Sequence, residues 1–267
     1  MNTADLLSIK EFSDFTGIKQ SILRYYDEIN LFNPIMRGKN NYRYYSCQQI
    51  VTVNLINVLV NLNIPRKKIL ELTQLRSPQL ILELLSNQEH ILDAQIRGIS
   101  ESYSIIHTFR KLIEMGFSVQ ENVLYEEILP SFHISLGKRN HLDNYSQFYP
   151  AFINYCHESK MQGTNLNYPI GGYYENIAAF TEMPSQPTHF FSLTPSGKDI
   201  KPAGNHIVGY LRGYYGEMAD FPQKLKNYAT HRNLTLSHPI YVIYLHDEIS
   251  ISDPNQYLAQ ISTFVPL

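Results

Sequence analysis

Residues 22–34 read ILRYYDEINLFNP, and residues 40–50 read NNYRYYSCQQI. The two stretches share the triplet Arg-Tyr-Tyr, at residues 24–26 and again at residues 43–45. Neighbouring side chains on a helix or a strand point in different directions, so we expect one tyrosine of each pair to be buried. Two interpretations follow. The triplets are core residues that happen to follow arginine, or they face one partner from two elements.

The residues around the first triplet predict two short helices joined by a tight turn. Ser8-Ile-Lys-Glu11 matches a capping box, in which the serine and glutamate side chains bond free amides at a helix start. A helix over residues 8–15 is followed by a turn at Thr16-Gly17 and by a second helix from Ile18 to Glu28. This order is typical of a helix-turn-helix, whose second helix can enter a DNA major groove.

The turn-forming residues between 30 and 41 predict a wing. They are flanked by Leu31-Phe32 and by Tyr42 to Tyr45, which suit short strands, so we expect a hairpin.

Two further helices follow the predicted wing. Ser46-Cys-Gln-Gln49 is a second candidate capping box, placed before an apolar helix over residues 50–62. Pro65 suits the first turn of another helix that ends near Arg76. Residues 1–76 are therefore expected to form a winged helix-turn-helix domain that is all-helical apart from its wing.

Ser77-Pro78 begins the longest helical pattern in the chain, which ends at Gly116. Apolar residues recur in it at seven-residue intervals: Leu85, Leu92, Ile99, Ile106 and Ile113. A second heptad position holds Ile96 and Tyr103, whereas Gln88, Gln95 and Ser102 make half of the seam polar. The pattern predicts a dimerisation helix over residues 77–116 that forms a coiled coil with a second copy. The alternative is packing against the protein's own domain.

From Phe117 onward the apolar pattern has the period of two that is typical of strands. The strand-like stretches are ENVLYEEIL, SFHISLG, YPIGGYYENIAAF, THFFSLTP, NHIVGYLRGYY, PIYVIYLHDEIS and YLAQISTFV. Helix-like stretches at residues 143–160 and 217–232 lie between them. The order strand-strand-helix-strand-strand occurs twice, which predicts an antiparallel α+β domain over residues 117–267 made of two similar halves.

Charge is divided unevenly along the chain. Residues 1–76 contain ten Lys/Arg and six Asp/Glu, a net charge of +4, within a chain of net charge −2. The excess favours contact between the N-terminal part and phosphate. We expect a cytoplasmic protein with no membrane association, because no apolar run reaches the length of a membrane span and the start does not resemble a signal peptide. The two cysteines, Cys47 and Cys156, are far apart and predict neither a disulfide framework nor a metal site, and we expect no cofactor.

Arginine can bond phosphate in a fork geometry, and a tyrosine hydroxyl can donate to phosphate without adding charge. The candidate DNA-contacting residues are Lys19, Ser21, Arg24, Tyr25 and Tyr26 on the second helix, Tyr42, Arg43 and Tyr44 on the wing, and Arg66 and Lys67 after Pro65. The basic run at residues 66–68 is equally well explained as solvated surface.

Fourteen of the 20 tyrosines follow Phe117, and the chain has no tryptophan. Such a set favours a pocket for a flat aromatic or amphipathic ligand, although any one tyrosine can be structural. The candidate ligand-binding residues are Tyr149, Tyr168, Tyr174, Glu175, His206, Tyr210, Tyr241 and Tyr244. No zinc-protease, nucleophile-elbow or phosphate-loop motif occurs in the sequence, so we do not expect an enzyme.

Taken in order, LRYYDEINLFNP, NNYRYYSCQQI, NIPRKKILEL and the heptads resemble the MerR family of bacterial transcription regulators over residues 6–115. The pair Leu-Arg-Tyr-Tyr-Asp and Tyr-Arg-Tyr-Tyr is the specific part of this resemblance. The residues after Gly116 resemble the GyrI-like effector-binding domain of BmrR-like, multidrug-sensing members.

The resemblance implies a homodimer held by an antiparallel coiled coil and bound to an operator in the promoter spacer. In this family an activated dimer bends and untwists DNA, so RNA polymerase is reached indirectly, through the DNA. The resemblance also places residues 24–26 in the recognition helix and residues 42–44 in the wing. Family recognition helices usually begin with serine or threonine, so Lys19 predicts a different helix cap here.

The resemblance further implies a glutamate that meets cationic drugs in the strand at residues 240–245. This chain has Val242 at that place and Gln260 at another commonly acidic one. We therefore expect a pocket that prefers neutral or weakly polar aromatic ligands, unless Glu175 or Glu182 supplies a charge.

Two other functions stay open at this point. Some GyrI-like domains are hydrolases that use a glutamate and a tyrosine, for which Glu175 beside Tyr174 would be the candidates. The C-terminal domain could instead bind a protein and no small ligand.

Overall fold

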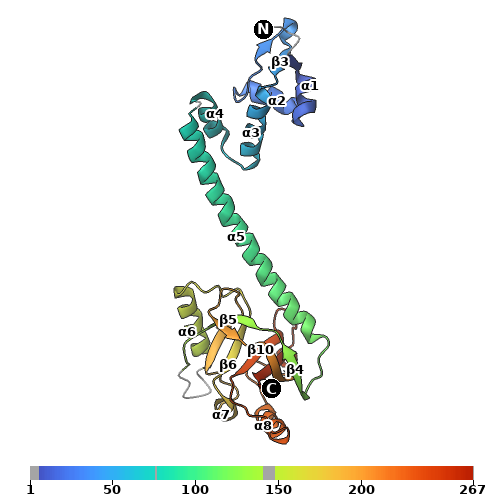
Figure 1. Cartoon of the computed structure of the whole chain (residues 1–267), viewed down its shortest axis with the longest axis vertical. Coiled ribbons are helices and arrows are strands. Elements are labelled where there is room, and N and C mark those ends of the chain that lie inside the picture. Colours follow the sequence, from blue (N-terminus) through green and yellow to red (C-terminus); the bar gives the residue numbers. More distant parts are fainter. Residues whose placement is uncertain (1–5, 76, 141–147, 267) are drawn as a thin grey trace. The chain divides into compact units, whose positions relative to one another are not determined.

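The computed structural model describes residues 6–75, 77–140 and 148–266 (Figure 1). The chain divides into two compact units, one ending at residue 96 and the other beginning at residue 97, so the division falls within the long helix α5 (Pro78–Gly116). The domain boundaries expected at residues 76 and 116 stay predictions.

The first unit is a set of short helices with a small antiparallel sheet. Its strands are β1 (Leu6–Ser8), β2 (Met36–Arg37) and β3 (Arg43–Ser46), in the order β1-β3-β2. Its helical elements are α1 (Ile9–Thr16), α2 (Gln20–Glu28), the 3-10 turn η2 (Lys39–Asn41), α3 (Gln49–Asn61), α4 (Arg66–Leu75) and the beginning of α5. The predicted helix-turn-helix and wing are both present.

Local hydrogen bonds start and end α1. The Ser8 backbone N–H donates to Glu11 Oε2 at 2.8 Å, and the Glu11 N–H donates to Ser8 Oγ at 3.3 Å, which confirms the predicted capping box. Gly17 follows α1 with φ +68°, and its N–H donates to the Ser13 carbonyl at 2.9 Å. A side chain is disfavoured at this φ, so glycine is suited to the turn between α1 and α2.

Two predictions about the wing region are wrong. Leu31 and Phe32 do not form a strand: both are buried in the core, and the first wing strand begins only at Met36. The second capping box is only half formed, because the Ser46 N–H donates to Gln49 Oε1 at 3.0 Å while α3 begins at Gln49 without a side-chain cap. Ser46 is held in strand β3 instead, where it pairs with Leu6.

Aromatic packing joins the wing to the helices. The ring centroid of Tyr45 lies 4.5 Å from that of Phe12 and 5.7 Å from that of Phe32, with the rings stacked. All three residues are buried in one hydrophobic core. The last tyrosine of the second triplet is therefore a core residue.

The second unit contains the end of α5 and an eight-stranded antiparallel sheet in the order β4-β9-β11-β10-β6-β7-β5-β8. The strands are β4 (Leu124–Leu129), β5 (Phe132–Leu136), β6 (Ile170–Tyr174), β7 (His189–Ser192), β8 (Asp199–Lys201), β9 (Gly204–Arg212), β10 (Ile240–His246) and β11 (Leu258–Phe264). The helical elements are α6 (Phe148–Met161), α7 (Ile177–Glu182), α8 (Phe221–His231) and the 3-10 turn η4 (Pro254–Gln256).

The predicted duplication is present. The series β4-β5-α6-β6-β7 and β8-β9-α8-β10-β11 have the same order of elements, and α7 is an addition to the first half. The halves exchange their first strands, because β4 pairs with β9 and β8 pairs with β5. Of the helix expected over residues 143–160, residues 143–147 lie outside the described ranges; the helix expected over 217–232 begins at Phe221.

The sheet buries both of its faces. Ile240 and Val242 of β10 belong to a core that includes Phe221 of α8, whereas Tyr241 and Ile243 belong to a second core on the opposite face. Leu112, near the end of α5, is part of this second core. No helix within the described residues is long and apolar enough to cross a membrane.

Candidate nucleic-acid interface and effector site

Four of the five DNA-contacting side chains predicted for the second helix are exposed, on α2 or directly before it. Lys19, Ser21, Arg24 and Tyr25 are all exposed. Lys19 occupies the position before the helix and makes no side-chain cap, as the sequence predicted. The backbone amides at the start of α2 are therefore not capped by a side chain, and such amides can bind phosphate.

Tyr26 is a correction to the predicted interface. Only 2% of this residue is exposed, and it belongs to the core of the first unit, so its side chain cannot face a duplex. Tyr25 points outward instead, where the guanidinium of Arg66 lies 5.6 Å from the centroid of its ring. The structure thus joins the start of α4 to the exposed side of α2, with Lys67 and Lys68 also exposed.

The wing exposes Tyr42, whereas Tyr44 is half-buried with its ring centroid 5.5 Å from that of Tyr42. Gly38 lies under this pair: a Cβ atom there would come within 2.9 Å of the Tyr44 ring. A side chain at position 38 would therefore push Tyr44 aside, so glycine keeps the wing tip compact.

A buried carboxylate ties the wing to α2. Arg43 Nε and Arg37 Nη2 each donate to Asp27 Oδ2 at 2.6 Å, and the Asp27 side chain is only 3% exposed. Arg37 also donates to Asn41 Oδ1 at 2.8 Å. Sequence reasoning assigned Arg43 to DNA and missed Asp27 and Arg37. The aspartate that directly follows the first triplet was the available signal, since a buried carboxylate requires a cationic partner.

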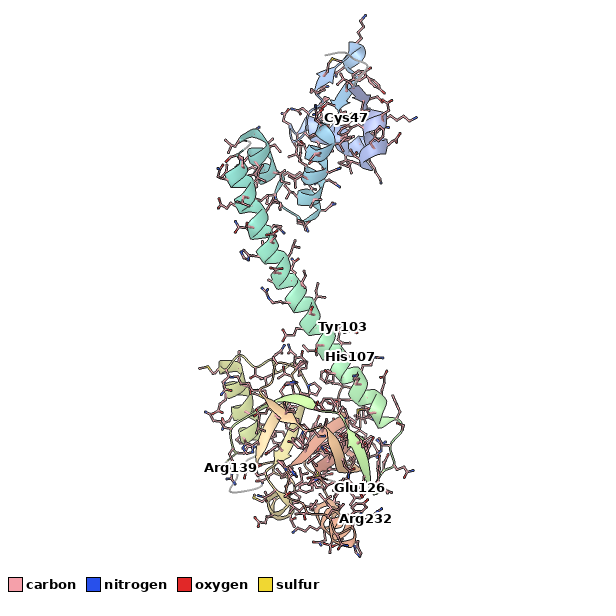
Figure 2. All side chains as sticks on the ribbon, viewed as in Figure 1. Cys47, Tyr103, His107, Glu126, Arg139 and Arg232 are labelled. Atoms are coloured by element: carbon pink, nitrogen blue, oxygen red, sulfur yellow. The ribbon has the colours of Figure 1, made fainter. Side chains whose placement is uncertain are left out.

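Helix α5 leaves part of its predicted seam exposed. Ile99 and Ile106 are 70% and 67% exposed, and Ile96 and Tyr103 are also exposed. Tyr103 stacks on His107 one turn further along, with ring centroids 5.9 Å apart (Figure 2). Apolar residues at this spacing on an exposed helix face are typical of a coiled-coil seam.

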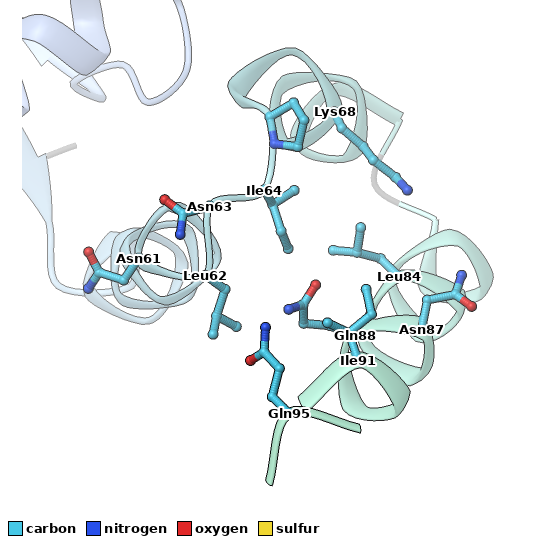
Figure 3. A pocket seen from close by; sticks show the side chains of 11 residues that line it. Asn61, Leu62, Asn63, Ile64, Lys68, Leu84, Asn87, Gln88, Ile91 and Gln95 are labelled. Atoms are coloured by element: carbon cyan, nitrogen blue, oxygen red, sulfur yellow. The ribbon is translucent and has the colours of Figure 1, made fainter. Parts of the chain in front are cut away.

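The ends of the seam pack within their own units. Leu85 contacts the core of the first unit, and the Ile113 carbonyl lies 3.0 Å from His246 Nε2. Gln88 and Gln95 line a pocket of about 400 Å³ beside α3 and α4 (Figure 3). The alternative of packing against the protein's own domain therefore holds for Leu85 and Ile113, and the exposed middle of α5 remains for a partner.

The predicted ligand-binding tyrosines do not converge on one site. Tyr174 and Tyr244 lie on the sheet face covered by α8, and the Tyr174 hydroxyl donates to the Pro184 carbonyl at 2.5 Å. Tyr210 and Tyr241 lie on the opposite face. Successive strand residues alternate between the two faces of a sheet. Tyr174 and Tyr244 therefore cannot line the same site as Tyr210 and Tyr241.

Two other candidates, Tyr149 and Tyr168, also lie elsewhere, and a third, Glu175, is held in ion pairs. Tyr149 is exposed on α6, with its hydroxyl 2.5 Å from that of Tyr214, and Tyr168 is buried before β6. Glu175 is within ion-pair distance of Arg139, at 3.2 Å, and of His189, at 3.9 Å. The His189 ring meets the Tyr173 ring edge-on at 5.2 Å, so Glu175 lies next to Tyr173, whose ring packs against Tyr241.

The face that carries Tyr210 and Tyr241 has further aromatic and polar side chains. Tyr125 and Tyr173 pack against its core, with ring centroids 6.2 Å from Tyr210 and 5.4 Å from Tyr241, respectively. The Gln260 amide donates to the Tyr210 hydroxyl at 3.0 Å. Val242 points to the opposite face, so it does not mark the place of a missing pocket acid. We call this surface, with its four tyrosines, the tyrosine face.

Four buried polar atoms on the tyrosine face have no hydrogen-bond partner among the described residues: Glu127 Oε2, Lys201 Nζ, His206 Nε2 and Ser262 Oγ. Strand register places them together, since Glu127 pairs with His206 and Ser262 pairs with Tyr241. Lys201 Nζ lies 5.5 Å from the centroid of the Tyr241 ring. Of these four, the sequence pointed only to His206.

Burial alters the protonation of this group. It lowers the pKa of Lys201 from 10.5 to about 8, an effect that Glu127 opposes. Burial, with Lys201 adding to it, lowers the pKa of His206 to about 4. His206 is therefore neutral at pH 7, and its Nδ1, 2.9 Å from the Gly204 carbonyl, must carry the proton. Nε2 is left as a buried acceptor.

Comparison with known proteins finds a family match for the first unit and relatives that span nearly the whole chain. Residues 8–45 match the model of the MerR family regulatory protein. The chain is 24% identical to the multidrug-efflux transporter 2 regulator of Bacillus subtilis, with 94% of this chain and 93% of the relative covered. It is also 24% identical to the multidrug-efflux transporter 1 regulator of the same organism, over 95% and 96% of the two chains.

Among solved structures, the EcmrR chain of a cryo-EM EcmrR–DNA complex covers 97% of this chain and 99% of its own length, with a TM-score of 0.40 and 18% identity. The family match itself spans α1, the turn at Gly17, α2, the wing strands and the residues of the Asp27 ion pairs. Residues 8–45 thus match a MerR family domain, and nearly the whole chain is similar to the two Bacillus regulators.

Proposed function

We propose that this protein is a ligand-responsive transcription regulator that binds promoter DNA as a homodimer. The observation that carries the proposal is the arrangement of α2 and the wing. Lys19, Arg24 and Tyr25 are exposed along α2, and the Asp27 ion pairs hold the wing beside this helix. An exposed basic helix with an adjacent wing fits a major groove and its flanking phosphates.

Dimerisation is assigned to the exposed middle of α5. The apolar side chains of Ile96, Ile99, Tyr103 and Ile106 would be removed from water by the same stretch of a second copy. An antiparallel pairing of the two helices would separate the two recognition helices, as a near-palindromic operator requires. We assign residues 1–76 to DNA binding, 77–116 to dimerisation and 117–267 to effector binding.

The effector is assigned to the tyrosine face. The two Bacillus relatives are named as regulators of multidrug-efflux transporters, which supports a small aromatic or amphipathic effector here. Tyrosine rings offer stacking surface to such a molecule, and the unpartnered polar atoms would receive its polar groups.

The response is assigned to deformation of the promoter. A dimer that bends and untwists a long spacer brings both promoter elements within reach of RNA polymerase. The regulator thus affects the polymerase through the shape of the DNA and not through direct contact. The protein then acts in the cytoplasm of a bacterial cell, where promoter DNA lies.

We propose binding without turnover. The pair that a hydrolase would use is not assembled: Tyr174 is buried with its hydroxyl bonded to the Pro184 carbonyl, while Glu175 pairs with Arg139. An effector recovered unaltered after prolonged incubation is the expected result, and its time-dependent consumption would contradict the proposal.

A footprint on the DNA upstream of the protein's own gene tests the function, with and without lipophilic aromatic compounds. We expect protection that does not change with the effector but gains a distortion at the operator centre. Release of DNA by the effector would show a repressor instead. Absence of protection at any concentration would contradict DNA binding, and Arg24→Ala provides the matched non-binding control.

A further inference from the structure

The tyrosine face contains a buried ammonium group that forms no hydrogen bond and no ion pair among the described residues. Lys201 is 1% exposed, its Nζ has no hydrogen-bond partner, and it belongs to none of the ion pairs among the described residues. A buried charge without a partner is costly, because the protein interior solvates it poorly. Glu127 acts on this ammonium group through its charge but forms no ion pair with it, so Nζ can still receive a partner from a ligand.

The surroundings of Lys201 favour an aromatic partner. The Tyr241 ring lies 5.5 Å from Nζ, and the Tyr173 ring meets Tyr241 edge-on at 5.4 Å. A flat molecule on this face would contact tyrosine rings and would bring its own polar edge to the ammonium group.

The other unpartnered polar atoms on the tyrosine face indicate which charge the polar edge of a ligand would carry. Ser262 can donate its hydroxyl proton, and Lys201 donates through Nζ, so two donors are available to a ligand acceptor. The acceptors are Glu127 Oε2 and His206 Nε2, which pair across β4 and β9. Glu127 is only partly buried, whereas Lys201 is fully buried, so the less solvated charge is the positive one.

We propose that the effector is an aromatic organic anion, with a carboxylate or an equivalent acidic group that pairs with the Lys201 ammonium. This inference rests on the proposed effector site and names the ligand class of that site. The carboxylate meets a donor that has already lost its hydration, so the ion pair forms with less desolvation than a surface pair. A lipophilic cation on the same face would be repelled by Lys201.

The tyrosine face is shielded by protein. Its unpartnered atoms are closed to solvent, and Leu112 of α5 belongs to the hydrophobic core on the same face of the sheet. An anion therefore reaches Lys201 only when side chains packed over the face move aside.

The test uses three naphthalene probes of one shape with the full-length chain: 2-naphthoate, neutral 2-naphthamide and the 2-naphthylmethylammonium cation. Isothermal titration calorimetry gives the Kd of each. We expect the naphthoate to bind at least about ten-fold tighter than the amide, the equivalent of a weak close charge pair, and the cation to bind most weakly.

Lys201→Met removes the charge but keeps an unbranched chain, and Lys198→Met removes an exposed lysine three residues away. We expect the first variant to bind the acid and the amide alike and the second to keep the ten-fold difference. Melting temperatures of both variants verify that they are folded, and the comparison of the three probes on the wild type needs no variant.

Two results would overturn the inference: tighter binding of the cation or the amide than of the acid, or an undiminished preference for the acid in Lys201→Met. If all three probes bind equally and Tyr241→Ala abolishes that binding, the effector site stands and only the anion preference is lost. No binding by any probe, with no effect of the probes on the footprint, would reject the anion and the proposed effector site together.

Discussion

Arg43 of the wing donates from Nε to Asp27 Oδ2 of α2 at 2.6 Å, and this bond links the two Arg-Tyr-Tyr stretches of the chain. Arg37 donates to the same oxygen at 2.6 Å. The second triplet contributes Arg43 to this ion-pair cluster, and Asp27, which directly follows the first triplet, is its carboxylate. Each triplet also contributes one buried tyrosine. The wing is positioned by charge as well as by the aromatic core.

Replacement of Asp27 by alanine should loosen the wing. It leaves two guanidinium groups close together without a counter-charge, and we expect the free energy of unfolding to fall by on the order of 2–3 kcal/mol, because Arg37 is partly exposed. Urea unfolding measures the loss, and promoter binding should weaken with it. Asp14→Ala, at an exposed position on α1, is the control. Equal stability of the two variants would show that the cluster contributes little.

Arg24→Ala should abolish operator binding and leave the dimer intact. Arg24 is exposed on α2 and its Nη2 lies 3.4 Å from Gln20 Oε1, so its loss removes no core contact. Filter binding should detect no operator complex of this variant at protein concentrations that saturate the operator with the wild type. Sedimentation should still give a dimer. Normal DNA binding by this variant would contradict a role of the first triplet in DNA contact and favour the interpretation that its residues only form the core.

Charge in the exposed seam should separate the dimer. Ile99→Asp with Ile106→Asp would place carboxylates where two α5 helices meet, and we expect the dimer Kd to rise by at least roughly 100-fold. Analytical ultracentrifugation measures it. Ser100→Asp adds a charge beside the seam and should leave the dimer unchanged. A double variant that stays dimeric at low concentration would place the interface elsewhere.

Lys201 should make stability depend on pH in the alkaline range. Its pKa is lowered from 10.5 to about 8 in the folded chain, so between these values the unfolded chain binds the proton and the folded chain does not. Stability conferred at this position therefore rises with pH from about 8 to 10.5. Below pH 8 the buried charge destabilises the wild type.

The matched comparison is Lys201→Met, which lacks the titrating group. At pH 7 we expect this variant to be more stable than the wild type by on the order of 3 kcal/mol, and the difference should shrink as the pH approaches 10.5. Urea unfolding at several pH values measures this difference in the free energy of unfolding. Ionisation of the tyrosines affects both proteins equally and does not contribute to the difference. A difference that does not vary with pH would mean that Lys201 keeps its ordinary pKa.

Local features of the fold were predictable from the sequence. The Ser8–Glu11 capping box, the turn at Gly17 and the twofold order of strands and helices depend on hydrogen bonds and periodicities between near neighbours. The rule that adjacent residues face opposite ways also predicted that each triplet would bury one tyrosine, as Tyr26 and Tyr45 do. The family resemblance over the first triplet and the wing followed from the same short stretches.

Only the tertiary structure decided which side chains meet. Asp27 lies 16 residues from Arg43, and Lys201 of β8 reaches Tyr241 of β10 across a sheet in which these strands are not neighbours. Strand register determines the face of every side chain, and a shift of one residue reverses it. For this reason the sequence could count fourteen tyrosines in the second half of the chain but could not separate Tyr174 and Tyr244 from the tyrosine face, nor place a lysine there.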